Sequence, residues 1–139
     1  MQKKIFLDAN ILLDLLLKRD GFETSRQLFD AVITGMVKGY TSVSILHILA
    51  YWLQKAYGSA TAKKLLLSLS EEITFLDCSH ASASQALLTS FSDIEDAIQY
   101  QTAIQHKVHF FITRDKGLMR QSDKALPALS PRAFLEAEL

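Results

Sequence analysis

Cysteine, proline and glycine are all scarce in this sequence. One cysteine, two prolines and five glycines occur among 139 residues. The single cysteine, Cys78, cannot form a disulfide within the chain, and we interpret it as a small buried hydrophobic residue rather than as a nucleophile. With so little proline and glycine and with 49% hydrophobic residues, the composition excludes a collagen-like repeat or a disordered tail.

An excess of charge of either sign is also missing, because 15 basic residues balance 15 acidic ones. General electrostatic attraction to nucleic acid is therefore excluded, and only a local basic patch could bind it. The longest apolar run, Ile11 to Leu17, is interrupted by Asp14 and is too short to span a membrane. A strand is predicted within three residues of Met1, so we expect no signal peptide. We expect a cytoplasmic protein with one domain, residues 1–139.

Short apolar runs alternate with segments of helical periodicity along the chain. Asn10 is the predicted cap of a first helix, and Gly39 is the predicted end of a second helix that starts at Glu23. Strands are predicted at residues 4–7, 40–41, 72–76 and 108–113. Further helices are predicted at 42–57, 60–69, 80–88, 93–106 and from Ser130 onward, and a charged loop at 114–117. This alternation predicts an α/β fold, a three-layer α/β/α sandwich around a short, mostly parallel sheet.

Two aspartates follow the two most apolar predicted strands. Asp8 comes directly after Ile5-Phe6-Leu7, and Asp115 comes two residues after the run that ends at Thr113. Ligands of open parallel sheets bind outside the carboxyl ends of the strands. A lone aspartate at such a place is more often a helix cap or turn residue, but two together indicate a site.

A third group of acids opens the helix before the last predicted strand, in Ser92-Asp93-Ile94-Glu95-Asp96-Ala97. Asp93 and Asp96 are three residues apart and share a helix face, with Ile94, Ala97 and Ile98 expected to face the core. The alternative is a solvated cluster of caps at a helix start. If Asp96 instead meets Asp8 and Asp115, their mutual repulsion calls for a hard cation with oxygen ligands, Mg²⁺ or Mn²⁺. Such an ion would support hydrolysis of a phosphodiester.

Three segments of the sequence resemble the motifs of the PIN domain family. They are residues 5–11, residues 93–100 and Phe111-Ile112-Thr113-Arg114-Asp115, and their order, their spacing and the chain length agree with that family. The resemblance also covers the Ser-Pro-x-x-Phe-Leu segment at residues 130–135. It implies an α/β/α sandwich that cleaves RNA with Mg²⁺ or Mn²⁺ held by about four acids. Many single-domain members are VapC-type toxins, which are homodimers inhibited by a small antitoxin protein.

By this resemblance, Asp8, Asp96 and Asp115 are the catalytic residues and metal ligands, and Asp93 contributes from the rim. Glu95 is the less favoured acid, because it lies a quarter-turn from Asp96. The resemblance also gives supporting roles to two polar residues that lie within the motifs, Asn10 and Thr113. Two basic residues on the Asp115 loop, Arg114 and Lys116, are candidates to contact substrate phosphates, although an ordinary solvated face has the same composition.

One family acid is missing from this sequence. The family has a glutamate in the helix after the second strand, about six positions past a Thr-Ser pair such as Thr41-Ser42. Here that position is Ile48, or His47 if the register shifts by one. We expect weaker metal binding as a result. His47 is a possible Mn²⁺ ligand, but a single histidine on a helix is more often a partly buried polar residue.

Two other functions compete with the ribonuclease hypothesis. A phosphotransferase of the haloacid dehalogenase type needs a second aspartate two residues after the first, and position 10 is asparagine. The stronger alternative is a PIN-like domain that has lost catalysis and acts by binding protein or RNA, which the missing glutamate favours. The RNA target, the partner, the number of ions and the oligomeric state are left open by the sequence.

Overall fold

The buried run at the start of the chain forms the central strand of a parallel sheet. The computed structural model describes residues 2–139, and β1 spans Lys3–Leu7. The five strands of this part of the chain lie in the order β3-β2-β1-β4-β5 and all pair in parallel. The other strands are β2 (Val37–Ser42), β3 (Ile73–Leu76), β4 (Phe110–Ile112) and β5 (Ala128–Leu129).

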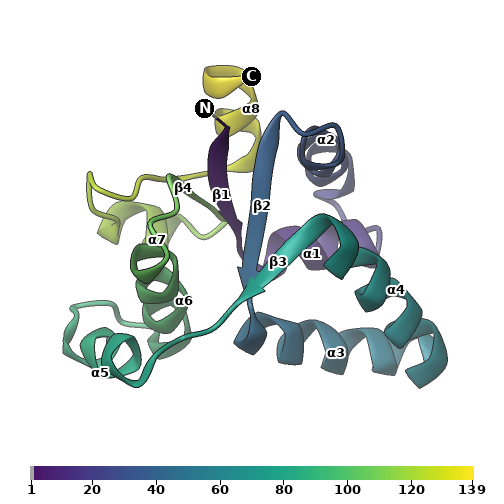
Figure 1. Cartoon of the computed structure of the whole chain (residues 1–139), viewed down its shortest axis with the longest axis horizontal. Coiled ribbons are helices and arrows are strands. Elements are labelled where there is room, and N and C mark those ends of the chain that lie inside the picture. The colour runs from purple at the N-terminus through teal and green to yellow at the C-terminus, as the bar shows by residue number, and fades with distance from the viewer. Residues whose placement is uncertain (1) are drawn as a thin grey trace.

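Within the described residues 2–139, eight helices flank the sheet and complete the predicted three-layer α/β/α sandwich. They are α1 (Ala9–Leu16), α2 (Phe22–Ile33), α3 (Val43–Tyr57), α4 (Ser59–Glu72), α5 (His80–Leu88), α6 (Ile94–Gln105), α7 (Lys116–Gln121) and α8 (Pro131–Glu138). Figure 1 shows α5 and α6 together on one side of β1 and β2, and the α3–α4 pair on the other. Every helix within residues 2–139 is too short or too polar to span a lipid bilayer.

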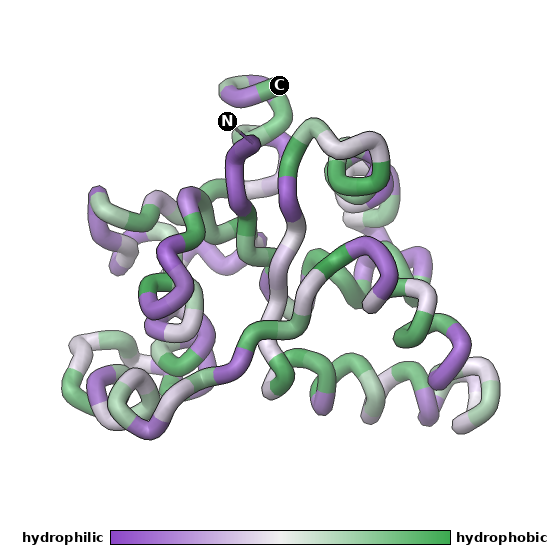
Figure 2. The backbone as a smooth tube through the Cα atoms, viewed as in Figure 1, coloured by the Kyte–Doolittle hydropathy of each residue, from purple (hydrophilic) through white to green (hydrophobic). Residues whose placement is uncertain are grey.

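Large buried side chains gather where β1 meets β4. Phe6 pairs in register with Phe111, and their rings stack with centroids 4.9 Å apart. Both side chains are fully buried, as are Leu7 and Ile112 next to them. Burying a side chain of this size contributes about 1.5–3 kcal/mol, so these strand ends are firmly held. Figure 2 shows that α3 is hydrophobic over much of its length, which fits its packing against the sheet.

The prediction for the second helix is wrong at its C-terminal end. We expected it to run to Lys38, whereas α2 stops at Ile33 and the chain turns at Gly35, whose φ of +81° favours glycine. Gly39, the expected helix end, lies inside β2. A Cβ there would be 2.8 Å from Cγ2 of Ile73 on β3, so Gly39 permits close strand packing. The short predicted strand at 40–41 is thus the end of a longer one.

Other boundaries agree closely with the prediction, with small corrections. The helices at 80–88 and after Ser130 are confirmed, and Ser130 caps α8. Ala97 is buried as expected, and Tyr100 is buried one turn later, whereas Ile94, also expected in the core, is 62% exposed at the start of α6. The two-residue strand β5 was not predicted.

Candidate acidic site at the strand ends

The strand order places Asp8 and Asp115 at the same edge of the sheet. From β1 the chain moves outward through β2 and β3, and then returns to place β4 on the other side of β1. The carboxyl ends of β1 and β4 therefore meet where the strand order reverses, which is the usual position of a ligand site in such sheets. Asp8 follows Leu7, and Asp115 follows the β4 strand by three residues.

Asp8 is the buried member of the site, with 5% of its surface exposed. Its Oδ1 accepts a hydrogen bond of 2.8 Å from the amide of Ala9, and its Oδ2 accepts one of 2.7 Å from Thr113 Oγ1. Burial raises the pKa of the Asp8 carboxyl, the two hydrogen bonds oppose that rise, and the charges of Asp115 and Asp93 add to it. Asp8, and not Asn10, is the N-cap of α1, because its side chain accepts from the first helical amide. Asn10 lies exposed in the first turn.

Asp115 is fixed by the start of a short helix. We expected a loop at residues 114–117, but Asp115 caps α7, and its Oδ1 accepts from the amides of Gly117 and Leu118 at 2.8 and 3.1 Å. The Asp115 amide in turn donates to Thr113 Oγ1 at 3.0 Å. Thr113 thus links the side chain of Asp8 to the backbone of Asp115.

The third carboxylate comes from the start of α6. Asp93 is the N-cap of this helix, and its Oδ1 accepts from the amide of Asp96 at 3.0 Å. The pKa of Asp96 is raised to about 7 by burial, by the charges of Asp8, Asp93 and Asp115, and by hydrogen bonding with the Asp115 carboxyl. The four aspartates are therefore close enough to act on one another, although their segments lie far apart in the sequence.

Glu95 also belongs to this acidic region, although sequence reasoning favoured it less. Burial and the charges of Asp93 and Asp8 raise the pKa of its carboxyl. The side chain is exposed at the surface beside Asp93. Glu95 therefore still experiences the charge of Asp8, although it lies a quarter-turn from Asp96 on the helix.

The donor set suits a hard divalent cation, because it consists of carboxylate oxygens that repel one another. Within residues 2–139, however, no three carboxyl, imidazole or thiol groups lie close enough together to coordinate one metal ion. The side chains act on one another through their charges, and Asp8 is the most deeply buried of them.

The position of the missing glutamate lies in α3, whose first residues are hydrogen-bonded to α6. Ser42 caps α3 and donates a hydrogen bond to Oε1 of the buried Gln99, whose Nε2 donates to Ser44 Oγ at 2.6 Å. Ile48 is one helical turn beyond Ser44, and Asp96 is one turn before Gln99. Ile48 is half-buried and packs against the core, so no acid is supplied from this position.

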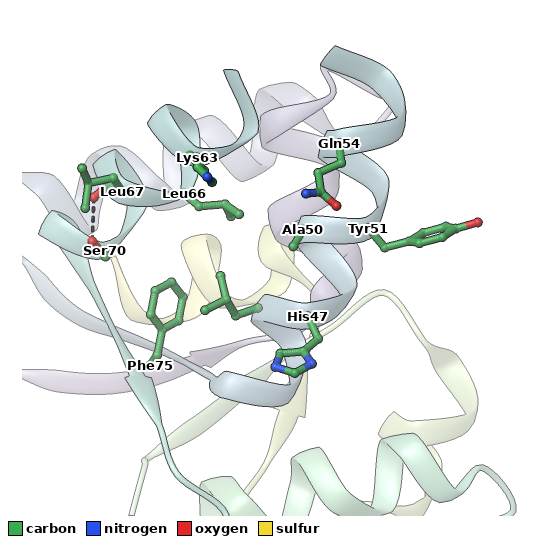
Figure 3. Close-up of a pocket in the computed structure, with 10 residues that line it drawn as sticks. His47, Ala50, Tyr51, Gln54, Lys63, Leu66, Leu67, Ser70 and Phe75 are labelled. Atoms are coloured by element: carbon green, nitrogen blue, oxygen red, sulfur yellow. Dashed lines mark hydrogen bonds between the residues drawn. The ribbon is translucent and has the colours of Figure 1, made fainter. Parts of the chain in front are cut away.

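His47 faces a different surface. It lines an apolar groove of about 760 Å³ between α3 and α4, where Ala50, Tyr51, Leu66 and Phe75 also contribute (Figure 3). The exposed Tyr51 lies at this groove and makes an edge-on contact with Trp52. Both aromatic side chains are exposed in the single chain.

The two predicted phosphate contacts have different surroundings. Lys116 is exposed at the start of α7, beside Asp115. Nε of Arg114 lies 3.0 Å from Oδ2 of Asp14, a fully buried carboxylate of α1. Nothing in the sequence indicates this pairing, since Asp14 was noted only as a break in an apolar run.

Comparison with solved structures finds the same fold in toxins. A toxin–antitoxin complex from Klebsiella pneumoniae matches with a TM-score of 0.69 and 19% identity, over 91% of this chain and 97% of that one. Mycobacterium tuberculosis VapC20, described as a Sarcin-Ricin loop cleaving toxin, matches with a TM-score of 0.67 and 16% identity, over 82% and 92%. VapBC2 from Rickettsia felis, bound to a DNA fragment from its promoter, matches with a TM-score of 0.63 and 14% identity, over 89% and 96%.

Sequence comparison identifies the family. None of the curated proteins matches the sequence. The sequence profile of the PIN domain matches residues 4–117, which contain Asp8, Asp96 and Asp115. This is most of the chain, and it agrees with the motifs and with the fold. The protein belongs to the PIN domain family.

Proposed function

We propose that this protein is a metal-dependent endoribonuclease that hydrolyses RNA phosphodiester bonds. The observation that carries the proposal is the placement of Asp8 and Asp115 at the carboxyl edge of the sheet, where Thr113 joins them and where the charges of Asp93 and Asp96 reach them. Burial, together with the charges of the other three aspartates, raises the pKa of Asp96 to about 7. Such unfavourable charge is retained at functional sites, where a cation or a reacting group offsets it.

In this proposal Asp8, Asp96 and Asp115 hold Mg²⁺ or Mn²⁺, and Asp93 contributes from the rim. When bound, the ion supplies positive charge to the scissile phosphate and an activated water. Thr113 orients Asp8 through the hydrogen bond to Oδ2, and the amide of Ala9 fixes Oδ1. Asn10 supports the site from the first turn of α1, and Lys116 contacts substrate phosphates beside Asp115.

The biological role that we propose is that of a toxin, with a small antitoxin protein as its partner, acting in the cytoplasm as a homodimer. Toxin–antitoxin complexes among the structures of the same fold support this assignment. The apolar groove between α3 and α4 is compatible with a protein partner.

A second function is favoured by the missing glutamate. With Ile48 in its place, three principal acids remain, and the domain could act by binding protein or RNA without cleavage. This alternative predicts that no RNA is cleaved and that Mn²⁺ does not bind with measurable affinity.

The experiment that decides between them is a calorimetric titration with Mn²⁺ of the wild type and of Asp96→Asn. Asp30→Asn is the matched control, because Asp30 lies on the exposed surface of α2 and pairs with Arg26. We expect saturable binding that is lost in Asp96→Asn and kept in Asp30→Asn, followed by loss of RNA cleavage in the same variant. Absence of binding in the wild type up to millimolar Mn²⁺ would overturn the metal-dependent proposal.

A further inference from the structure

A buried aspartate outside the acidic site holds two arginines. Asp14 lies in α1 with 1% of its side chain exposed. Its Oδ1 accepts a hydrogen bond of 3.1 Å from Nε of Arg19, and Nε of Arg114 lies 3.0 Å from its Oδ2. A carboxylate this deeply buried requires compensating charge, and losing one partner of such a group is costly.

The carboxylate of Asp14 has little freedom to move. Gly21, in the connection between α1 and α2, packs against it so tightly that a Cβ at position 21 would lie 2.2 Å from Oδ2. Within residues 2–139, Oδ2 has no hydrogen-bond donor in line with it, so Arg114 is held by charge and proximity. Asp14 is therefore a fixed anionic anchor in the first helix.

The two arginines connect this anchor to different parts of the chain. Arg19 is five residues from Asp14 and fixes only the end of the first helix. Arg114 comes from the other half of the chain and lies between Thr113 and Asp115. Since Thr113 is held by Asp8, the turn that carries Asp115 is held at two consecutive residues by two aspartates of the β1–α1 segment.

We propose that Asp14 is a positioning residue that sets the placement of Asp115 through Arg114. The inference rests on the proposed function for its catalytic meaning, but the anchoring itself does not require metal or RNA. Arg114 is then a tether of the turn rather than a contact for substrate phosphates.

The charges around the two arginines favour this role over that of a phosphate site. Asp14, Arg19, Asp20 and Arg114 line one open cavity of about 440 Å³. Its two cations are balanced by two carboxylates, so it offers an anion no net attraction. A tether needs only the contact between Arg114 and Asp14, which is present.

The test compares Arg114→Gln with Arg19→Gln. Each removes one guanidinium from the same buried carboxylate, but only Arg114 lies on the Asp115 turn. The first readout is amide hydrogen exchange at Asp115, Gly117 and Leu118, whose amides are bonded within the turn and cap. We expect at least about tenfold faster exchange at these amides in Arg114→Gln, and wild-type exchange there in Arg19→Gln. Equal exchange at these amides in the two variants would overturn the inference.

The second readout is Mn²⁺ affinity, which a merely structural role would not change. We expect about 10- to 100-fold weaker binding in Arg114→Gln, none of this loss in Arg19→Gln, and partial recovery in Arg114→Lys, which keeps the charge. If wild type binds no Mn²⁺, the proposed function fails while the exchange result still decides the inference. If both variants bind Mn²⁺ normally but lose RNA affinity equally, the two arginines form a phosphate site and the inference is wrong.

Discussion

The hydroxyl of Thr113 donates a hydrogen bond of 2.7 Å to Oδ2 of Asp8, and it thereby joins the ends of two neighbouring strands. Thr41 makes a comparable bond on the other side of β1, where its hydroxyl donates to the carbonyl of Leu7 at 2.8 Å. Both threonines are fully buried. The two bonds differ in their acceptor, which is a carboxylate in one and a neutral carbonyl in the other.

Replacing Thr113 by valine should therefore lower the free energy of unfolding more than replacing Thr41 by valine. A bond to a charged group contributes about 1.5–3 kcal/mol and a neutral bond about 0.5–1.5 kcal/mol. Thr113→Val also removes a bond that lowers the pKa of Asp8, so that pKa should rise further. In urea unfolding, the loss of stability caused by Thr113→Val should grow as pH rises and Asp8 ionises. The loss caused by Thr41→Val should not change with pH. Equal costs at every pH would contradict this.

The sheet and its two strand-end aspartates could be predicted because the evidence is local. Ile5-Phe6-Leu7 and the run ending at Thr113 are long enough and apolar enough to mark buried strands, and parallel pairing brings Asp8 and Asp115 to one edge. By contrast, β2 was mostly missed, because helical spacing continues through Val37 and Gly39 was read as a helix end. The glycine is required instead by a neighbouring strand, which the local sequence does not show.

Long-range polar partners could not be predicted for the same reason. Asp14 and Arg114 pair across most of the chain, and nothing in the spacing of either residue indicates the other. Asn10 was chosen as a cap on residue type alone, although Asp8 provides the cap once the strand end fixes its backbone. Tertiary structure decides such choices when several capping residues lie close together in the sequence.

The raised pKa of Asp96 predicts how stability depends on pH. Its ordinary value is 3.8 and its folded value is about 7, so between these values the folded state holds a proton that the unfolded state has lost. Stability must therefore fall as pH rises through this window. Asp96→Asn removes the ionising group, and it should flatten the slope and raise stability at alkaline pH by about 1–2 kcal/mol after solvent screening. Thermal unfolding across the pH range measures this, and an unchanged slope in the variant would refute it.

The same proton should compete with metal ions. Because Asp96 must lose its proton to bind a cation, Mn²⁺ affinity should weaken below pH of about 7, by up to about tenfold for each pH unit. Calorimetry in buffers of different ionisation enthalpy would also detect the released proton. If the affinity of the wild type stayed constant down to the ordinary carboxyl range, Asp96 would not be a ligand.

A last prediction restores the missing acid. Ile48 lies one turn beyond Ser44 on α3, and Ser44 is hydrogen-bonded to Gln99, one turn after Asp96 on α6. Ile48→Glu should therefore direct a further carboxylate towards the acidic site, and we expect tighter Mn²⁺ binding and faster RNA cleavage. The added charge should also destabilise the metal-free protein, because Ile48 is half-buried and Asp96 already experiences repulsion.

The matched control for this gain is His47→Glu. It adds the same charge at the neighbouring position, but His47 lines the groove between α3 and α4. Mn²⁺ affinity should therefore stay at the wild-type value in His47→Glu. Equal gains in the two variants would mean that general negative charge attracts the ion, whereas a gain confined to Ile48→Glu would show that the α3 face completes the metal site. No gain in either variant would mean that a carboxylate on α3 does not reach the metal site. Any metal binding would then depend on the aspartates after β1, at the start of α6 and at the α7 cap.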